Sequence, residues 1–234
     1  NPLTSAKLLI QNAVQRQGGR PLGDRQLRIV FEEILRMENT IQGLLDFARP
    51  SQLNRVRHDL RNTVSRALNL FQGRAKQEGI SVIEEFPAAP VVVDGDPEQL
   101  HQVFVNLLLN SVESMGQGGS LCTRVLSPPG QNVCQVVLAD SGPGIPAELV
   151  ERIFEPFVTS KEHGTGLGLA ISRRIVETHG GTITAANGAK QGAVFTVELP
   201  RYSGVSSTAL GDAVPGSQPP SPPTSESPKE SAHA

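Results

Sequence analysis

A segment that begins at Asp96-Pro97 constrains the fold most, because it predicts a helix that is apolar on nearly every side. Aspartate is a favoured N-cap residue and proline is favoured at the first helical position, so we expect a helix over residues 97–115. Its apolar residues extend around most of the helix circumference: Leu100, Val103, Phe104, Val105, Leu107, Leu108, Leu109 and Val112. A helix of this kind must be covered by other elements, which predicts a layered domain.

The elements around this helix alternate between helical and extended patterns from about residue 56 to residue 199. Two further helices are expected, at 60–76 and 167–178. Strands are expected at 80–86, 121–126, 132–139, 181–186 and 193–199. This order predicts an α+β domain over residues 53–200, a two-layer α/β sandwich in which a mixed sheet carries its helices on one face.

The first 52 residues predict a helical hairpin. Apolar residues of its second helix follow an alternating spacing of three and four, namely Leu27, Val30, Ile34, Met37, Ile41, Leu44 and Ala48. Two helices of this length cannot cover two apolar seams alone, so we expect a homodimer in which two hairpins form a four-helix bundle. Packing of the hairpin against its own neighbouring domain is the alternative. Residues 201–234 are rich in serine and proline and are expected to be a disordered tail.

Composition narrows the class of protein. The net charge of −2 gives no basic excess, so we expect no nucleic-acid partner. Two scattered cysteines, Cys122 and Cys134, are too few for a disulfide framework or a zinc site. No apolar run is long enough to cross a bilayer, and the chain begins with Asn1. We therefore expect a cytoplasmic fragment of a longer protein, with any attachment to the inner membrane lying in upstream regions.

Two asparagines interrupt the apolar helix. Asn106 and Asn110 lie one turn apart and therefore side by side, with Glu113 on the same side. An unpaired buried polar group costs about 1–3 kcal/mol, so both amides need partners. A cluster of Mg²⁺ and phosphate groups could supply them. Core asparagines that bond backbone groups elsewhere are the alternative.

A second polar group follows the strand expected at 132–139. Asp140 stands at the strand end and is followed by Gly142 and Gly144. A carboxylate in this position can accept a hydrogen bond from an exocyclic amine such as that of adenine, and glycines let the backbone pass close to a base. Taken alone, the same residues are also typical of a turn.

A third group opens the helix expected at 167–178. Residues 164–169 read GTGLGL, and glycine-rich backbone before a helix N-terminus presents N–H donors to phosphate. The segment lacks the ending of a Walker loop. Residues 153–161 could form a lid anchored by its aromatic residues, from which Lys161 could reach a phosphate. The candidate phosphate-binding residues are Lys161, Gly164, Thr165, Gly166, Leu167 and Gly168.

Together these segments resemble the catalytic domain of histidine kinases, within the wider family that includes gyrase, Hsp90 and MutL. Residues 105–111 resemble the N box, 140–144 the first glycine box, 154–157 the F box, and 164–169 the second glycine box. Each motif alone is weak, but four in order make a specific match. The resemblance covers residues 56–199 and implies the ATP-binding fold of that family.

The resemblance also implies roles around the phosphates. Asn110 is the expected Mg²⁺ ligand, Asn106 faces the phosphates of ATP, and Gly166 and Gly168 lie beside them. Relatives that hydrolyse ATP carry a glutamate at the position of Asn106, where it acts as a general base. An amide cannot take a proton, so we expect poor hydrolysis and transfer of the phosphoryl group to a protein.

At the base end of the nucleotide, the resemblance implies that Asp140 binds the adenine amine and that Gly142 and Gly144 shape the pocket. One departure from the family pattern lies nearby. The closing strand often begins with a hydroxyl residue after its glycine, whereas here Gly192 is followed by Ala193. A water-mediated contact near the base is therefore expected to be missing.

The first five residues, NPLTS, resemble the end of the histidine kinase H box. In that pattern the phosphoacceptor histidine lies four residues before Asn1, outside this sequence. His58 also begins a His-acid-x-x-Asn pattern, but it lacks the following Pro-Leu and is not the expected acceptor. The resemblance implies a sensor histidine kinase core whose phosphoryl group passes to the receiver domain of a response regulator. A gyrase-like ATPase or clamp, and a degenerate dimerisation module, are the alternatives.

Overall fold

The computed structural model describes residues 53–116, 118–161, 164–189 and 191–202, together with residues 10, 25, 27–32, 34, 37 and 41. The described residues before residue 53 are helical, in agreement with the heptad spacing. Most of the predicted hairpin, and the predicted tail beyond residue 202, lie outside the described residues.

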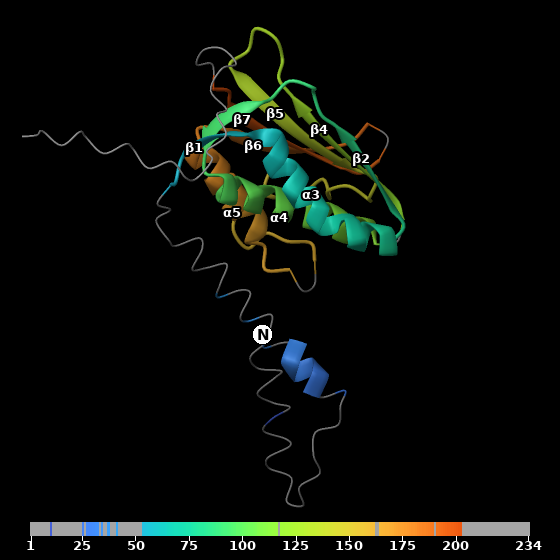
Figure 1. The fold of residues 1–234 in the computed structure, drawn as a ribbon. Helices are drawn as coiled ribbons and strands as arrows, with labels where there is room; N and C mark the ends of the chain where they lie inside the picture. The colour runs from blue at the N-terminus through green and yellow to red at the C-terminus, as the bar shows by residue number, and fades with distance from the viewer. Residues whose placement is uncertain are drawn as a thin grey trace, which may run out of the picture. The chain divides into compact units, whose positions relative to one another are not determined.

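A five-stranded mixed sheet forms one layer of the domain (Figure 1). Its strands lie in the order β2-β4-β5-β7-β6. Strands β2 and β4 are parallel, and the other neighbours are antiparallel. The strand bounds are Ile80–Glu85 for β2, Gly119–Leu126 for β4, Val133–Asp140 for β5, Thr182–Asn187 for β6 and Ala193–Pro200 for β7.

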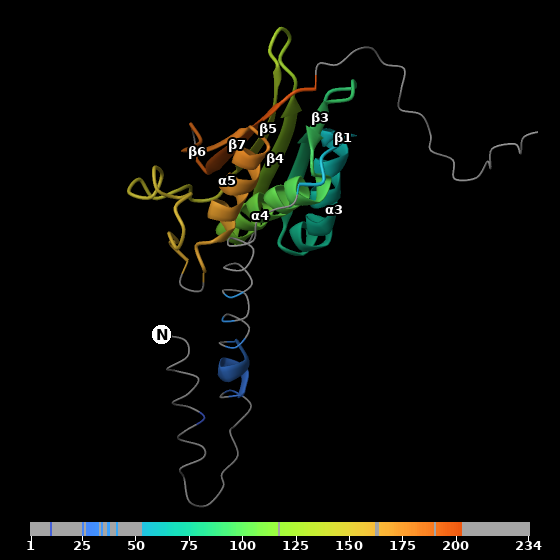
Figure 2. The same cartoon turned by 90° about the vertical axis from the view of Figure 1, so that its left-hand side faces the viewer.

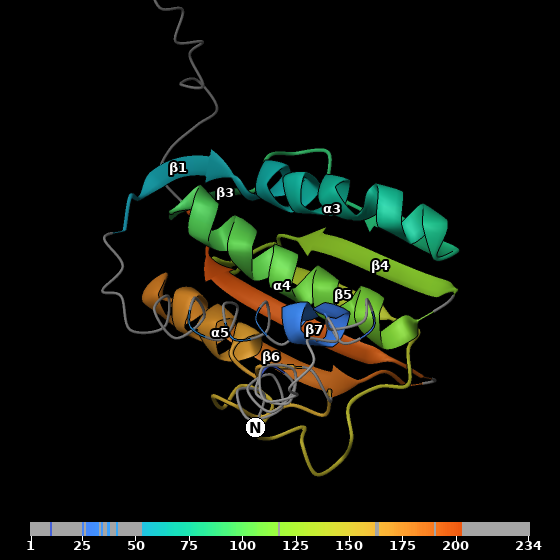
Figure 3. The same cartoon turned by 90° about the horizontal axis from the view of Figure 1, so that it is seen from below.

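Three helices form the second layer, over one face of the sheet (Figure 2 and Figure 3). They are α3 (Leu60–Gln77), α4 (Pro97–Met115) and α5 (Gly168–Thr178). Helix α4 lies between the other two and contacts both. The predicted α+β class and two-layer arrangement are therefore confirmed. None of the helices among the described residues is long and apolar enough to cross a membrane.

Helix α4 is the centre of the helical layer and begins where the sequence predicts. Oδ1 of Asp96 accepts hydrogen bonds from the backbone N–H groups of Glu98 and Gln99, which caps the helix. Its inward side chains are fully buried: Leu100, Val103, Phe104, Leu107, Leu108 and Val112. Each contributes about 1.5–3 kcal/mol by burial, so the core fixes the rotation of α4 and the direction in which its asparagines point.

A small two-stranded sheet was not predicted from the sequence. One of its strands directly precedes α3 in the sequence, and the other precedes α4. Strands β1 (Val56–Asp59) and β3 (Val92–Gly95) pair antiparallel. His58 lies on β1, where its Nδ1 is 3.1 Å from the carbonyl oxygen of Val56 and its Nε2 is shielded from solvent.

A buried histidine joins the end of α5 to the start of α4. Nε2 of His179 accepts a hydrogen bond from the backbone N–H of Asp96 at 2.9 Å, and Nδ1 donates to the carbonyl of Ile175 at 2.7 Å. This pattern requires the neutral ring with its proton on Nδ1. Burial lowers the pKa of His179, against the opposing effect of the bond to Ile175.

Candidate functional site

A cavity of about 530 Å³ lies between α4, the loop after β5 and the start of α5. Its volume is within the range of roughly 300–1,000 Å³ that is usual for small-molecule sites. The three groups of candidate residues meet there, since its lining includes Asn106, Asn110, Asp140, Gly144, Lys161, Gly164, Thr165, Gly166 and Gly168. Residues from three separate segments of the chain thus share one site.

Asn106 faces the start of α5. Its Nδ2 donates to the carbonyl of Gly168 at 3.3 Å and lies 3.4 Å from the hydroxyl oxygen of Ser172. The Ser172 hydroxyl donates to the same carbonyl at 2.9 Å. These bonds hold the NH₂ group of Asn106 against α5, so the amide is a partnered polar group and not an orphan in the core.

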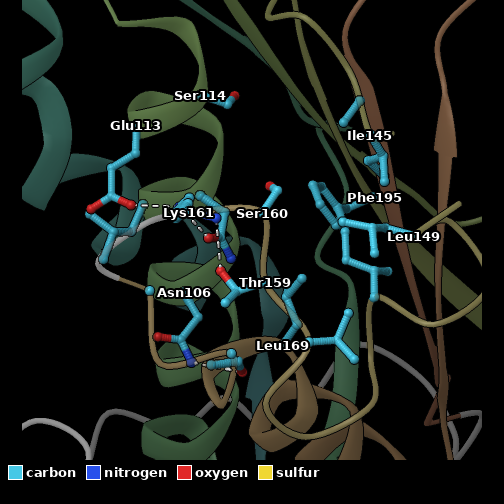
Figure 4. A pocket seen from close by; sticks show the side chains of 18 of the residues that line it. Asn106, Glu113, Ser114, Ile145, Leu149, Thr159, Ser160, Lys161, Leu169 and Phe195 are labelled. Carbon is cyan, nitrogen blue, oxygen red and sulfur yellow. Dashed lines mark hydrogen bonds and ion pairs between the residues drawn. The ribbon is translucent and has the colours of Figure 1, made fainter. Parts of the chain in front are cut away.

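Asn110 and Glu113 hold a cation between them. Nζ of Lys161 lies 2.8 Å from Oδ1 of Asn110 and 2.6 Å from Oε2 of Glu113 (Figure 4). An amide oxygen and a carboxylate oxygen are the kinds of ligand that Mg²⁺ prefers. The ammonium group is a stand-in for such a cation, so the residues present fit a magnesium ion at Asn110.

Asp140 ends β5, whose residues alternate between the helical layer and the opposite face. This alternation turns its side chain toward the helices and leaves it only 6% exposed. Oδ1 accepts hydrogen bonds from the backbone N–H groups of Gly142 at 2.9 Å and Ala193 at 3.0 Å. Within the part of the chain that the structure describes, Oδ2 takes no hydrogen bond. A carboxylate held in this way can accept a hydrogen bond from a ligand amine.

The segment at the start of β7 packs tightly against Asp140. Gly192 has φ +87°, and a Cβ atom there would lie 1.7 Å from the Asp140 carbonyl oxygen. Only glycine fits this place. Ala193 lacks the hydroxyl expected at its position, but its backbone N–H still reaches Asp140.

A backbone hydrogen bond joins the predicted lid segment, residues 153–161, to the glycine-rich segment at 164–169. The N–H of Phe157 donates to the carbonyl of Gly166 at 3.0 Å, and both residues have positive φ, +67° and +66°. The two aromatic residues of this segment differ. Phe154 is buried and anchors the segment, as predicted, whereas Phe157 is 63% exposed. Phe157 is therefore held by a backbone hydrogen bond and not by burial of its ring.

Two predicted residues lie outside the cavity lining. Gly142 acts through its backbone, which holds the Asp140 carboxylate. Leu167 is only 1% exposed and belongs to the hydrophobic core, and α5 begins one residue later than predicted, at Gly168. The side chain of Leu167 therefore packs in the core and does not line the cavity.

Apolar side chains also line the cavity, namely Leu109, Ile145, Leu149, Ile153, Leu169 and Phe195. Three of them, Ile145, Leu149 and Phe195, lie across the cavity from Lys161 and Glu113 and form an apolar wall (Figure 4). The sequence pattern does not distinguish these residues from core residues, because an apolar residue that lines a cavity has the same periodicity as one in the core. Such a wall suits a flat heterocycle, with the polar cluster left for charged groups.

The fold and the site define a nucleotide-binding α/β domain, and comparisons with known proteins agree. Residues 95–203 match the family of histidine kinase-, DNA gyrase B- and HSP90-like ATPases. The catalytic domain of histidine kinase ThkA, in a nucleotide-free form, is 34% identical with a TM-score of 0.59, over 63% of this chain and 96% of that one. The chain therefore belongs to the histidine kinase family, and its described domain is the ATP-binding catalytic domain.

Two further comparisons extend beyond this domain. Sporulation kinase A of Bacillus subtilis (strain 168) is 34% identical over 86% of this chain, which spans 32% of that relative. The structure of histidine kinase ThkA in complex with the response regulator protein TrrA matches 86% of this chain and 58% of that one, at 28% identity and a TM-score of 0.72. The chain thus corresponds to about a third of the length of the curated relative.

Proposed function

We propose that this chain is the kinase core of a sensor histidine kinase, which binds Mg²⁺-ATP and transfers the γ-phosphoryl group to a histidine. The observation that carries the proposal is the composition of a single cavity. At one end Asp140 has a carboxylate oxygen available for an amine, and at the other the oxygens of Asn110 and Glu113 hold the ammonium group of Lys161. ATP carries a matching amine at one end and a matching magnesium-bound triphosphate at the other.

Each residue has a separate task in this proposal. Asn110 holds the magnesium ion, which neutralises charge on the phosphates when it is bound. Lys161 and the backbone N–H groups of 164–168 bind phosphate oxygens. Asn106 contributes a neutral amide, so no carboxylate is available there to activate water for hydrolysis. Positioning and charge neutralisation carry the reaction, as in other phosphoryl transfers.

The acceptor in this proposal is a histidine four residues before Asn1, as the H-box resemblance implies. One of its imidazole nitrogens forms the new bond to phosphorus, the bond from the γ-phosphorus to the bridging oxygen breaks, and ADP leaves. The position of His58 on β1, with Nε2 shielded from solvent, supports its exclusion as the acceptor.

The proposed partners are a second copy of the chain and a response regulator. Two hairpins at residues 1–52 would form the four-helix bundle, and the phosphoryl group would pass from histidine to an aspartate of a receiver domain. The solved complex of ThkA with TrrA supports a partner of this kind. Light scattering should give the mass of a dimer.

A labelling experiment tests the proposed reaction. The chain, extended upstream to include the H-box histidine, is incubated with γ-labelled ATP and Mg²⁺. We expect a label that is stable to base and labile to acid, that persists in His58→Ala and that is lost when the upstream histidine is replaced. Steady phosphate release without protein labelling would instead identify an ATPase or clamp. No nucleotide binding at all would identify a degenerate dimerisation module.

A further inference from the structure

The side chain of Asn187 forms a pair of hydrogen bonds with the backbone of one residue far away in the sequence. Its Oδ1 accepts from the N–H of Ile145 at 2.6 Å, and its Nδ2 donates to the carbonyl of Ile145 at 2.8 Å. A neighbouring strand would bond a residue in the same way. Only an amide side chain carries a donor and an acceptor arranged like a peptide group.

The pair is not needed for the turn in which Asn187 lies. Asparagine before glycine is common in hairpin turns. The turn between β6 and β7, however, has its own hydrogen bond, from the N–H of Gly188 to the carbonyl of Gly192 at 2.9 Å. The Asn187 side chain turns away from this bond to reach the loop after β5, so its contacts serve that loop.

This loop forms one side of the cavity at the end where Asp140 lies. Ile145 lines the cavity as part of the apolar wall and is only 7% exposed. Gly144 also lines the cavity and has φ +83°. A Cβ atom added at Gly144 would lie only 2.7 Å from Oδ1 of Asn187. The loop is thus fixed at two places: at its start by the bond from Gly142 to Asp140, and at Ile145 by Asn187.

We propose that Asn187 is a positioning residue for the base of the nucleotide: through Ile145 it sets the distance between the apolar wall and the carboxylate of Asp140. The inference rests on the proposed function, since it takes the ligand to be a purine nucleotide. Asn187 lies at the Asp140 end of the site, away from the cluster of Asn110, Glu113 and Lys161. It therefore affects binding of the base and leaves binding of the phosphates unchanged.

The test compares two ligands in the presence of Mg²⁺, ADP and inorganic tripolyphosphate, which has no base. In Asn187→Asp the shape is kept, but an oxygen replaces the donor and faces the carbonyl of Ile145. The variant loses the hydrogen bond to the Ile145 carbonyl and places two acceptor oxygens against each other. We expect this change to raise the Kd for ADP, measured by calorimetry, at least tenfold. The Kd for tripolyphosphate should stay within twofold. Thr184→Ala, an exposed change on the same strand, should alter neither value.

Asn187→Ala provides a second variant if the aspartate variant does not fold, because it removes both hydrogen bonds to Ile145 without placing an acceptor against the Ile145 carbonyl. Circular dichroism establishes that each variant is folded. Unchanged ADP affinity in a folded variant would overturn the inference, as would an equal loss of ADP and tripolyphosphate. If the unaltered chain bound neither ligand, the proposed function itself would fail, and the inference with it.

Discussion

The ammonium group of Lys161 lies 2.8 Å from the amide oxygen of Asn110, the atom that is proposed to bind magnesium. An ammonium group and Mg²⁺ at the same oxygen would repel each other, because both are positively charged. In the proposed site, Mg²⁺ would therefore displace Lys161 from Asn110, and the displaced ammonium group would be available for a phosphate. The proposed metal site and the lid segment would then be coupled through one side-chain oxygen.

Replacement of Asn110 by alanine should remove the effect of magnesium on nucleotide binding. The variant loses the oxygen that holds the cation, so its Kd for ATP in Mg²⁺ should approach the value measured in excess chelator. Calorimetry in both buffers gives the two values. Ser114→Ala changes another residue of the cavity lining and serves as the matched control. A normal magnesium dependence in Asn110→Ala would contradict the proposed metal site.

Two changes at Asp140 should separate binding from folding. In Asp140→Asn the remaining oxygen can still accept from Gly142 and Ala193, so the domain should stay folded, but affinity for ATP should fall at least tenfold. In Asp140→Ala both N–H groups lose their acceptor, at a cost of about 1–3 kcal/mol each. Urea denaturation should therefore show a much lower free energy of unfolding for alanine than for asparagine. Equal stability of the two variants would argue against the structural role of Oδ1.

Gly192→Ala should be strongly destabilising, whereas Gly73→Ala should not. Gly192 combines positive φ with a backbone oxygen in the place of the added Cβ, and the strained conformation alone costs about 1–3 kcal/mol. Gly73 lies within α3 with nothing near its Cβ position. Alanine there should stabilise the domain by about 0.5–1 kcal/mol. Thermal midpoints of the two variants should shift in opposite directions.

Lower pH should decrease the free energy of unfolding of the domain through His179. Burial lowers its pKa, so the folded state favours the neutral ring, whose Nε2 accepts the N–H of Asp96. This contribution to stability is complete above the unfolded-state pKa of about 6.5, and it is lost as the pH falls through the folded-state pKa. The free energy of unfolding should decrease below pH 6.5, by at most about 1.4 kcal/mol per pH unit from this group. His179→Gln should be less stable at pH 8 and show a flatter dependence in urea titrations, and an unchanged slope would contradict this assignment.

Local signals in the sequence were sufficient for the larger elements. The cap at Asp96, followed by Pro97, predicted the first residue of α4, and its apolar residues predicted its burial. The residues from Asp140 to Gly144 predicted a strand end followed by a turn, whereas the candidate role of Asp140 at the base came only from the resemblance of four motifs together. In each case the physical cause lies within a few residues of the signal.

Features that depend on distant pairings were not predictable in this way. Strands β1 and β3 have four residues each, and 32 residues separate Asp59 from Val92 in the sequence, with no periodic pattern to mark the pairing. The bonds between Asn187 and Ile145 join residues 42 positions apart. Asn187 precedes Gly188, which is typical of a hairpin turn, and its partner is set by the sheet and not by its neighbours in the sequence.

The hydrogen bond between Phe157 and Gly166 also determines how the chain can change in length. Since these two residues meet, the segment between them leaves and returns to the domain at nearly one point, as the base of an Ω-loop does. Closing a flexible loop costs only about 0.6 kcal/mol more for each doubling of its length. Insertions between residues 157 and 166 should therefore leave the sheet and helices unaffected, so the domain can accept a different loop length here without a change of scaffold.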